Sequence, residues 1–195
     1  MISVLVLPLI SVLVLPIGWL EYRLLQKTRW GILLGILNFT VLYGPWIVAV
    51  LRLPDYLTDG ATAATGLVML ITGLILLTVT GPVVLRIPGQ MRTMPRTLLT
   101  EGPYRWSRHP LYMGHVLLIC GGVLALASLE LFLVTPILWV IAAIASRYEE
   151  NTRLKPQFGE AFRRYQAQTP FLLPLWGWIL WGIIYLGAMA QSIVS

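Results

Sequence analysis

The chain has 195 residues, of which 57% are hydrophobic and 11% are charged, and its net charge is +6. Soluble domains carry about 25% charged residues, so this composition excludes an ordinary soluble domain and predicts a single membrane domain over residues 1–195. The lone cysteine, Cys120, cannot form a disulfide within the chain, so nothing in the sequence requires an oxidising compartment.

Apolar runs of the length of membrane helices alternate with polar links along the chain. The first run lacks the cationic start of a signal peptide, so it is predicted to be a retained membrane segment. The pattern predicts an all-α, polytopic integral membrane protein with five to six transmembrane helices, surrounded by membrane lipids. The N-terminal transmembrane helices are expected within 1–85 and the C-terminal one at 171–194. The six runs are 1–20, 30–51, 61–85, 110–128, 131–145 and 171–194.

The cations indicate the orientation of this domain. The links after the first, third and fifth runs hold three, five and five lysines and arginines, and Arg52 is the remaining one of the 14. By the positive-inside rule these three links are cytoplasmic and both termini lie on the opposite side. The positive charge is therefore explained by topology, and a nucleic-acid partner is not expected.

Helix packing is indicated in the middle of the chain. Gly66 and Gly73 in the third run are suited to close contact with a neighbouring helix. The fourth and fifth runs form a hairpin with a turn at Glu130, and the fifth run continues without a break signal into residues 146–151. Residues 153–168 are polar and amphipathic, with aromatic side chains at helical spacing. No Cys/His cluster has the spacing of metal ligands, so no metal is expected.

A polar stretch at 101–115 holds both histidines of the chain. Pro110 disfavours helix at the residue before it and is suited to the first helical position, so a helix is predicted to begin there. The backbone N–H groups of Leu111 and Tyr112 then face the polar end, where a carboxylate or phosphate would be stabilised. Tyr112 and His115, three residues apart, share a face of this helix.

A second polar cluster follows the fifth run, and the hairpin is expected to bring it to the level of the first. Arg147 and Glu150 share a helix face, whereas Glu149 points elsewhere. Carboxylates near a membrane are costly unless they are paired, so these residues are expected to meet the arginines of the loop or a cationic ligand. S-adenosylmethionine, which has a carboxylate, a sulfonium and an aromatic base, is one candidate ligand among several.

These two clusters carry a resemblance to the isoprenylcysteine carboxyl methyltransferase family of membrane enzymes and to its phospholipid N-methyltransferase relatives. It covers about residues 98–174, and the first three runs and the last hold no recognisable motif. One position departs from the pattern: many members have arginine where this chain has Phe171. The motifs are Gly102-Pro103-Tyr104-Arg105, Arg108-His109-Pro110-Leu111-Tyr112-Met113-Gly114, Arg147-Tyr148-Glu149-Glu150 and Thr169-Pro170-Phe171-Leu172-Leu173-Pro174.

The resemblance implies an S-adenosylmethionine-dependent methyltransferase whose cofactor binds at the cytoplasmic side. Arg147 and Glu150 are the implied catalytic residues, at the junction between the cofactor and the acceptor. The implied cofactor-binding residues are Tyr104, Arg108, His109, Pro110, Leu111, Tyr112, His115 and Glu149.

The expected acceptor is lipophilic and enters from the bilayer, and the reaction predicted first is carboxyl O-methylation of a prenylcysteine-like substrate. Phospholipid N-methylation, thiol S-methylation, an NADPH-dependent sterol-type membrane reductase and a non-catalytic membrane assembly protein are the alternatives. A carboxylate acceptor needs no base, whereas an amine or thiol must lose a proton, and the sequence offers His109, His115 and Glu149 without choosing between them. The sequence predicts no oligomeric state.

Overall fold

The computed structural model describes residues 7–25, 30–52, 60–86, 97–126 and 129–194. Helices are the only regular structure within these ranges, which agrees with the all-α prediction. The helices are η1 (Leu7–Leu13), α2 (Val14–Leu25), α3 (Trp30–Arg52), α4 (Gly60–Arg86), η2 (Gly102–Arg105), α5 (Pro110–Leu126), α6 (Leu129–Leu133), α7 (Pro136–Glu149), η3 (Glu150–Leu154), α8 (Lys155–Gln168) and α9 (Leu175–Val194).

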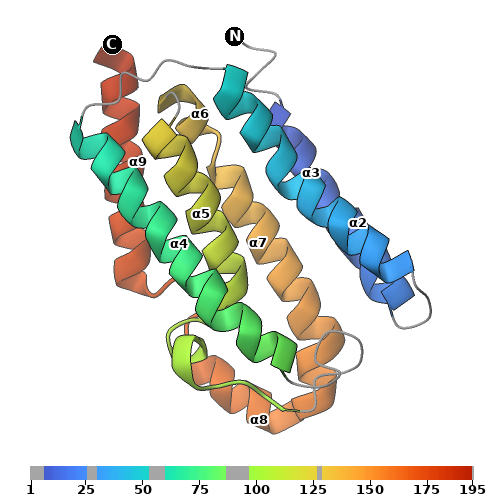
Figure 1. Ribbon diagram of the computed structural model, residues 1–195. Helices are drawn as coiled ribbons and strands as arrows, with labels where there is room; N and C mark the ends of the chain where they lie inside the picture. The colour runs from blue at the N-terminus through green and yellow to red at the C-terminus, as the bar shows by residue number, and fades with distance from the viewer. Residues whose placement is uncertain (1–6, 26–29, 53–59, 87–96, 127–128, 195) are drawn as a thin grey trace.

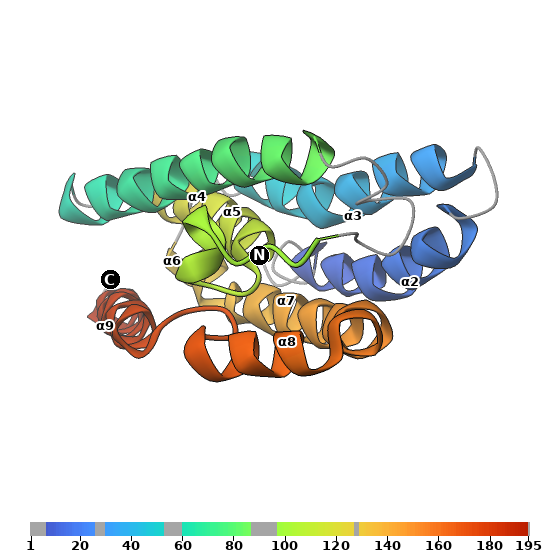
Figure 2. The same ribbon diagram turned by 90° about the horizontal axis from the view of Figure 1, so that it is seen from below.

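The long helices run up and down the molecule in turn (Figure 1). The helices α2 and α3 form one pair, and α4 packs along α5. The helix α7 descends beside α5, α8 crosses the lower end, and α9 returns to the top. Seen from below, α8 lies along one edge of this end of the bundle, beside α7 (Figure 2). The loop before α5 and the segment after α7, which hold the two predicted polar clusters, therefore meet at one end of the molecule.

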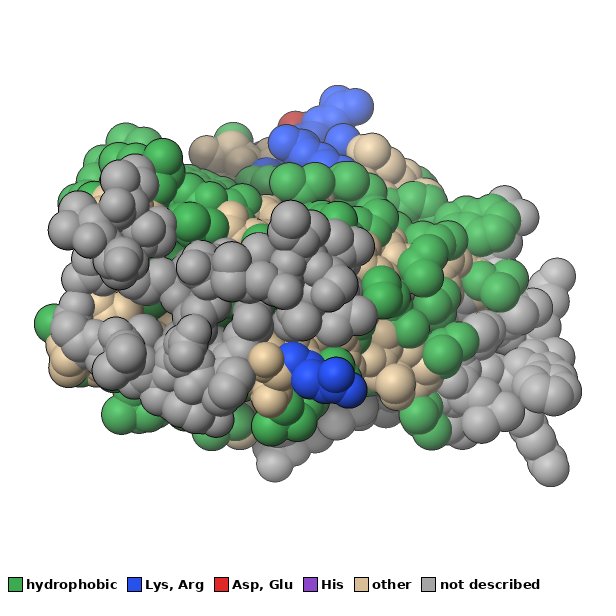
Figure 3. Space-filling model, turned by 90° about the horizontal axis from the view of Figure 1, so that it is seen from above, with side chains coloured by type: hydrophobic (Ala, Val, Ile, Leu, Met, Phe, Trp, Pro, Cys, Tyr) green, Lys and Arg blue, Asp and Glu red, His purple; other side chains and the backbone are tan. Residues whose placement is uncertain are grey.

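Two stretches of the described chain, Gly60–Gly81 and Leu131–Gln168, are long and apolar enough to cross a membrane. Four other apolar helices are shorter. Large apolar side chains nevertheless cover outer faces, as at Val68 and Ile183, which are 64% and 63% exposed. The described surface seen from the end opposite α8 is also mostly hydrophobic (Figure 3). Such exposure costs free energy in water but not in lipid, so the surface agrees with a membrane location.

The helices α4 and α5 are in contact along a seam of small residues. A Cβ atom added to Gly73 would lie 2.5 Å from the backbone nitrogen of Leu118, and one added to Gly121 would collide with the backbone of Leu70. Gly66 meets the backbone of α5 in the same way. The predicted close packing at Gly66 and Gly73 is confirmed, because only glycine leaves room for two backbones at this distance.

The hairpin differs from the prediction between its two long helices. Glu130 lies within the short helix α6 rather than at a turn, and the chain bends at 134–135 instead. The predicted continuous fifth run is wrong here, because Pro136 has no N–H to donate and begins a new helix, α7. The hydroxyl of Thr135 donates to the carbonyl of Phe132 at 2.6 Å and closes the bend.

From Pro136 through η3 the chain is helical without interruption, as predicted for 146–151, but it changes its winding and, within α8, its direction. At η3 it widens to a π-helix, in which the N–H of Lys155 donates to the carbonyl of Glu150. Pro156 follows, and Gly159 has φ +49°, where the chain turns into the amphipathic part of α8. A π-helical turn re-aims the side chains that it carries, and Glu150 is its first residue.

Candidate active site

The loop before α5 is held in place by backbone hydrogen bonds. The N–H of Arg108 donates to the carbonyl of Pro170 at 3.0 Å, which joins the loop to the segment after α8. The N–H of His109 donates to the hydroxyl of Ser107 at 3.1 Å, just before Pro110 begins the helix as predicted. All of these residues except Pro170 are buried, so Arg108 and His109 point into the protein rather than into solvent.

The carboxylate of Glu150 is completely buried and lies at the centre of a polar cluster built from three parts of the chain. Its Oε1 lies 3.3 Å from Nη1 of Arg108 and 3.1 Å from Nε2 of His109, both in the loop before α5. Its Oε2 accepts a hydrogen bond of 3.0 Å from Nε2 of Gln166 on α8 and lies 3.6 Å from Nη1 of Arg147 on α7. We call these five residues the Glu150 cluster.

The surroundings of Glu150 keep it ionised. Burial raises the pKa of a carboxyl group, but here the hydrogen bond with His109 and the positive charges of Arg108 and Arg147 outweigh it, and the pKa of Glu150 lies below its ordinary value. A buried charge without such partners costs several kcal/mol, at a rough estimate. Glu150 is therefore a fully partnered anion that holds two arginines and a histidine in fixed positions.

Phe171, which departs from the sequence pattern, is in contact with both arginines of the cluster. The guanidinium carbon of Arg147 lies 4.2 Å from the centre of its ring, and that of Arg108 lies 5.2 Å away. The ring of His109 meets Phe171 edge-on, with centroids 5.4 Å apart. A third arginine here would add repulsion, whereas the face of an aromatic ring attracts cations. Phe171 thus supports the cluster without adding charge.

Arg147 and Arg108 differ in their access to a ligand. The side chain of Arg147 is 57% exposed and reaches the surface above Phe171. The side chain of Arg108 is 8% exposed, and its Nε atom has no hydrogen-bond partner. A buried donor without a partner is uncommon in proteins and is expected to be satisfied by a bound molecule or water. The cluster therefore offers an exposed guanidinium and an unused buried donor.

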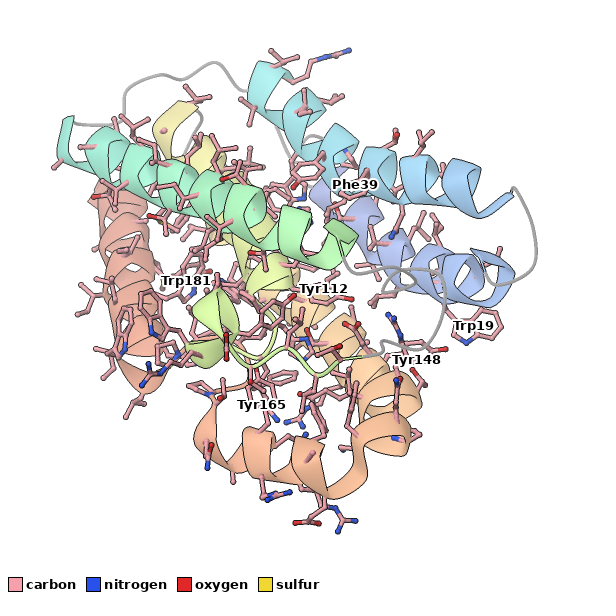
Figure 4. All side chains as sticks on the ribbon, turned by 60° about the horizontal axis from the view of Figure 1, so that its bottom comes forward. Trp19, Phe39, Tyr112, Tyr148, Tyr165 and Trp181 are labelled. Atoms are coloured by element: carbon pink, nitrogen blue, oxygen red, sulfur yellow. The ribbon has the colours of Figure 1, made fainter. Side chains whose placement is uncertain are left out.

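Two further predicted residues, Tyr104 and Glu149, lie beside the cluster. The hydroxyl of Tyr165 on α8 donates to the carbonyl of Tyr104 at 2.6 Å, and Figure 4 shows Tyr165 pointing from α8 toward this loop. Burial raises the pKa of both tyrosines, so both stay protonated at neutral pH. Oε1 of Glu149 pairs with Arg153 at 3.1 Å, and its Oε2 lies 3.9 Å from Nδ1 of His109. Glu149 is thus a second, partly exposed carboxylate next to His109.

The predicted residues on α5 separate into two groups. The ring of Tyr112 packs edge-on against His109, with centroids 5.8 Å apart, and Leu111 lies in the same first turn. His115 instead faces α3, where its Nδ1 atom is hydrogen-bonded to the hydroxyl of Tyr43 and its ring lies 5.6 Å from Phe39. In Figure 4, Tyr112 lies between Phe39 and Tyr165. The structure therefore brings Tyr112 to the cluster, whereas His115 contacts a neighbouring helix.

The sequence did not predict the contact of Gln166 with Glu150 or the supporting role of Phe171. Gln166 lies on the amphipathic helix, where the spacing of the aromatic residues indicates the buried face but not which polar side chain reaches inward. Its contact with Glu150 arises because η3 and Gly159 turn α8 back under the bundle. No group of three His, Cys, Asp or Glu side chains among the described residues is arranged to hold a metal ion.

About half of the chain matches the model of a known protein family. A family model described as phospholipid methyltransferase matches residues 60–161. The match takes in both polar clusters and also α4, which carries no motif noted in the sequence. No curated protein and no solved structure matches the chain significantly.

Proposed function

Because the chain belongs to the phospholipid methyltransferase family, we propose that it transfers a methyl group from S-adenosylmethionine to a lipophilic acceptor at the Glu150 cluster. Family membership makes the chain a methyltransferase for lipid-like substrates, and the resemblance seen in the sequence is confirmed at this level. Family membership also favours methyl transfer over the alternatives of a sterol-type reductase and a non-catalytic assembly protein. The convergence of both motifs on the buried Glu150 is the observation that supports this site.

The residues at the cluster fit the proposed cofactor. A carboxylate would be attracted by the exposed guanidinium of Arg147 and by the first N–H groups of α5, and the unused Nε of Arg108 provides a further donor. The face of Tyr112 suits a cationic or aromatic group. We propose that the cofactor contacts Tyr104, Arg108, His109, Pro110, Leu111, Tyr112 and Glu149. When bound, S-adenosylmethionine supplies an activated methyl group on a sulfonium.

Glu150 acts in this proposal as a positioning residue for the arginines and the histidine. Each of its oxygen atoms has two partners in the cluster, so no oxygen is left to accept a proton from the acceptor. Arg147, whose side chain is 57% exposed, is then the member of the cluster that can reach the acceptor as well as the cofactor. His115 is assigned a structural role, since Tyr43 holds its ring against α3.

The choice of acceptor depends on whether a base is present. Within the described part of the chain each predicted base is engaged: His109 with Glu150, Glu149 with Arg153 and His115 with Tyr43. A carboxylate acceptor needs no base, and its charge is neutralised as the methyl group is transferred, which a water-poor site favours. We therefore propose carboxyl O-methylation of a prenylcysteine-like substrate. The description of the matching family supports a second candidate, the amine of a phospholipid.

The proposed setting is a multi-pass membrane domain with the cluster on the cytoplasmic side. The alternating directions of the helices support this topology, since η1 and the end of α9 share the upper end in Figure 1. The clusters around Arg108 and Arg147 and the basic residues of α8 lie at the opposite end, which the positive-inside rule assigns to the cytoplasm. Both termini would then lie outside.

A methyl-transfer assay and a binding measurement test this proposal together. Purified full-length protein in nanodiscs is supplied with radiolabelled S-adenosylmethionine and with farnesylcysteine, phosphatidylethanolamine, a quinol or a small thiol. We expect label on farnesylcysteine, and label on phosphatidylethanolamine instead would support the second candidate. Calorimetry with S-adenosylhomocysteine should detect binding that is weakened in Arg147→Gln but not in Arg163→Gln. Absence of binding by folded protein, or NADPH oxidation with an enone, would contradict the proposal.

A further inference from the structure

A second polar site lies on the outer side of the loop that carries η2. A groove of ≈ 970 Å³ separates residues 98–105 from the second half of α8 and opens to the surface. Its polar lining consists of Thr100, Glu101, Arg105, Arg164, Gln168 and Thr169. No member of the Glu150 cluster lines it, and Tyr165 forms the wall between the two sites.

The two arginines of this groove are available to a ligand. Arg105 is the last residue of η2 and Arg164 lies on α8, and both are exposed. Neither has an ion-pair partner among the residues that the structure describes. Their neighbour Arg163, by contrast, pairs with Glu160 at 3.5 Å and does not line the groove. Two unpaired guanidinium groups facing one hollow are a recurrent arrangement for recognising phosphate.

The walls of the groove are fixed relative to each other. The hydroxyl of Tyr165 donates to the carbonyl of Tyr104 beneath the groove, at 2.6 Å. The N–H of Arg108 donates to the carbonyl of Pro170 at 3.0 Å and joins the same two segments. A phosphate would thus meet arginines carried by segments that are already joined, so ordering the backbone would cost little on binding.

The surroundings of the groove place it at the level of lipid headgroups. Trp106, directly after Arg105, is 69% exposed, and Trp176 at the start of α9 is 68% exposed. Exposed tryptophans gather where a membrane protein meets the boundary between lipid and water. Leu175, next to Trp176 in the chain, is 77% exposed, which suits contact with acyl chains. A phosphate at this depth would come from a lipid headgroup.

We propose that the groove between η2 and α8 binds the phosphate of a phospholipid headgroup through Arg105 and Arg164. Thr100 and Gln168 add uncharged hydrogen-bonding groups. Glu101, the carboxylate of the lining, repels phosphate and limits the net charge that the groove accepts. The site rests on contacts outside the Glu150 cluster, so it stands whichever acceptor is methylated. It would hold a lipid beside the proposed reaction site.

Native mass spectrometry of the full-length protein in detergent tests this site. The probes are phosphatidic acid, a diacylglycerol with the same acyl chains, and inorganic phosphate. We expect phosphatidic acid to bind, and the double variant Arg105→Gln/Arg164→Gln to bind it at least about tenfold more weakly. Arg163→Gln, the matched control on the same helix, should bind like the parent. Glu101→Gln should bind phosphatidic acid more tightly.

Three outcomes would overturn the proposal. Equal binding of diacylglycerol would show that the phosphate is not recognised. Inorganic phosphate binding as tightly as phosphatidic acid would show that the groove takes free phosphate rather than lipid. Equal losses in Arg163→Gln and in the double variant would show a general effect of surface charge. Binding of S-adenosylhomocysteine, measured in parallel, should be unchanged in the double variant, which confirms its fold and separates this site from the proposed methyl-transfer site.

Discussion

The seam between α4 and α5 and the Glu150 cluster are both tightly packed, but different forces hold them together. At the seam, glycines such as Gly73 and Gly121 let two backbones touch, and no charge is involved. At the cluster, one buried carboxylate meets four side chains from the loop before α5, from α7 and from α8. The seam depends on shape and the cluster on charge balance.

This difference teaches where each region is vulnerable. Close packing fails when volume is added, because backbones in contact have no flexible atoms to move aside. A buried ionic cluster fails when a charge is removed, because the remaining charges lose their partners. A substitution that keeps the size of a side chain but removes its charge should therefore damage the Glu150 cluster. A substitution that adds volume should damage the seam.

The largest effect is expected from Glu150→Gln, which keeps the size of the side chain and removes its charge. Arg108 would stay buried without a counter-ion, and breaking a buried pair in this way costs about 3–5 kcal/mol. Thermal unfolding in detergent, followed by tryptophan fluorescence, should show a large loss of stability together with loss of methyl transfer. The control is Glu160→Gln, whose side chain is 69% exposed and pairs with Arg163. Similar losses in both variants would contradict the role of the cluster.

The next effect tests the seam with the smallest possible addition of volume. Gly73→Ala should lower the free energy of unfolding by about 1–3 kcal/mol, since the added methyl group meets the backbone of Leu118. In Gly81→Ala, on the same helix, the methyl group has no atom within 4 Å and the change should be neutral or stabilising. The same unfolding assay checks both. If Gly73→Ala unfolds like the parent, the helices are not in contact as described.

A smaller effect is expected at Phe171, which joins packing and charge. Phe171→Leu removes the ring that faces Arg147 and Arg108, a loss of about 0.5–2 kcal/mol. Methyl-transfer kinetics should show a higher KM for the acceptor, because Arg147 is no longer held in position. Phe171→Tyr keeps the ring and should restore the parental KM. Equal KM values for Phe171→Leu and the parent would show that the ring does not hold Arg147 in position.

The smallest effect is expected from a change of pH near neutrality. The pKa of Glu150 is lowered in the folded protein, so the stability it contributes is complete above the ordinary glutamate pKa of 4.5. It is lost only as the pH falls through the lower folded-state pKa. The difference in unfolding temperature between the parent and Glu150→Gln should thus stay constant between about pH 6 and pH 8. It should shrink in acid, below the ordinary glutamate pKa of 4.5. A difference that shrinks between pH 6 and 8 would contradict an ionised, fully partnered Glu150.

Much of the helical framework could be predicted from the sequence because it follows from local patterns. The runs at 30–51, 61–85 and 110–128 end within a few residues of α3, α4 and α5, since polar links bound each apolar run. The bend before Pro136 escaped prediction because the residues around it are as apolar as the helices on either side. The seam at Gly66 and Gly73 could be predicted, because glycines in an apolar run are typical of close contact between helices.

The candidate site could be predicted only in part. Arg108, His109, Arg147 and Glu150 stand in recognisable motifs, and a hairpin of two similar helices returns the second motif to the first. The position of His115 could not be predicted, because its partner Tyr43 lies 72 residues away on α3. Helical periodicity placed His115 on a face with Tyr112 but did not show that α3 covers it.

By itself the sequence determined the helical class, the order of the apolar runs and the two motifs that place the chain in a methyltransferase family. These depend on composition and spacing, which are properties of neighbouring residues. Only the tertiary structure decided that Glu150 is saturated with partners, that the ring of Phe171 meets two arginines, and that Arg105 and Arg164 line one groove. The physical reason is that a π-helical turn and a kink at Gly159 set the direction of α8, and contacts made after such a bend are not encoded in local periodicity.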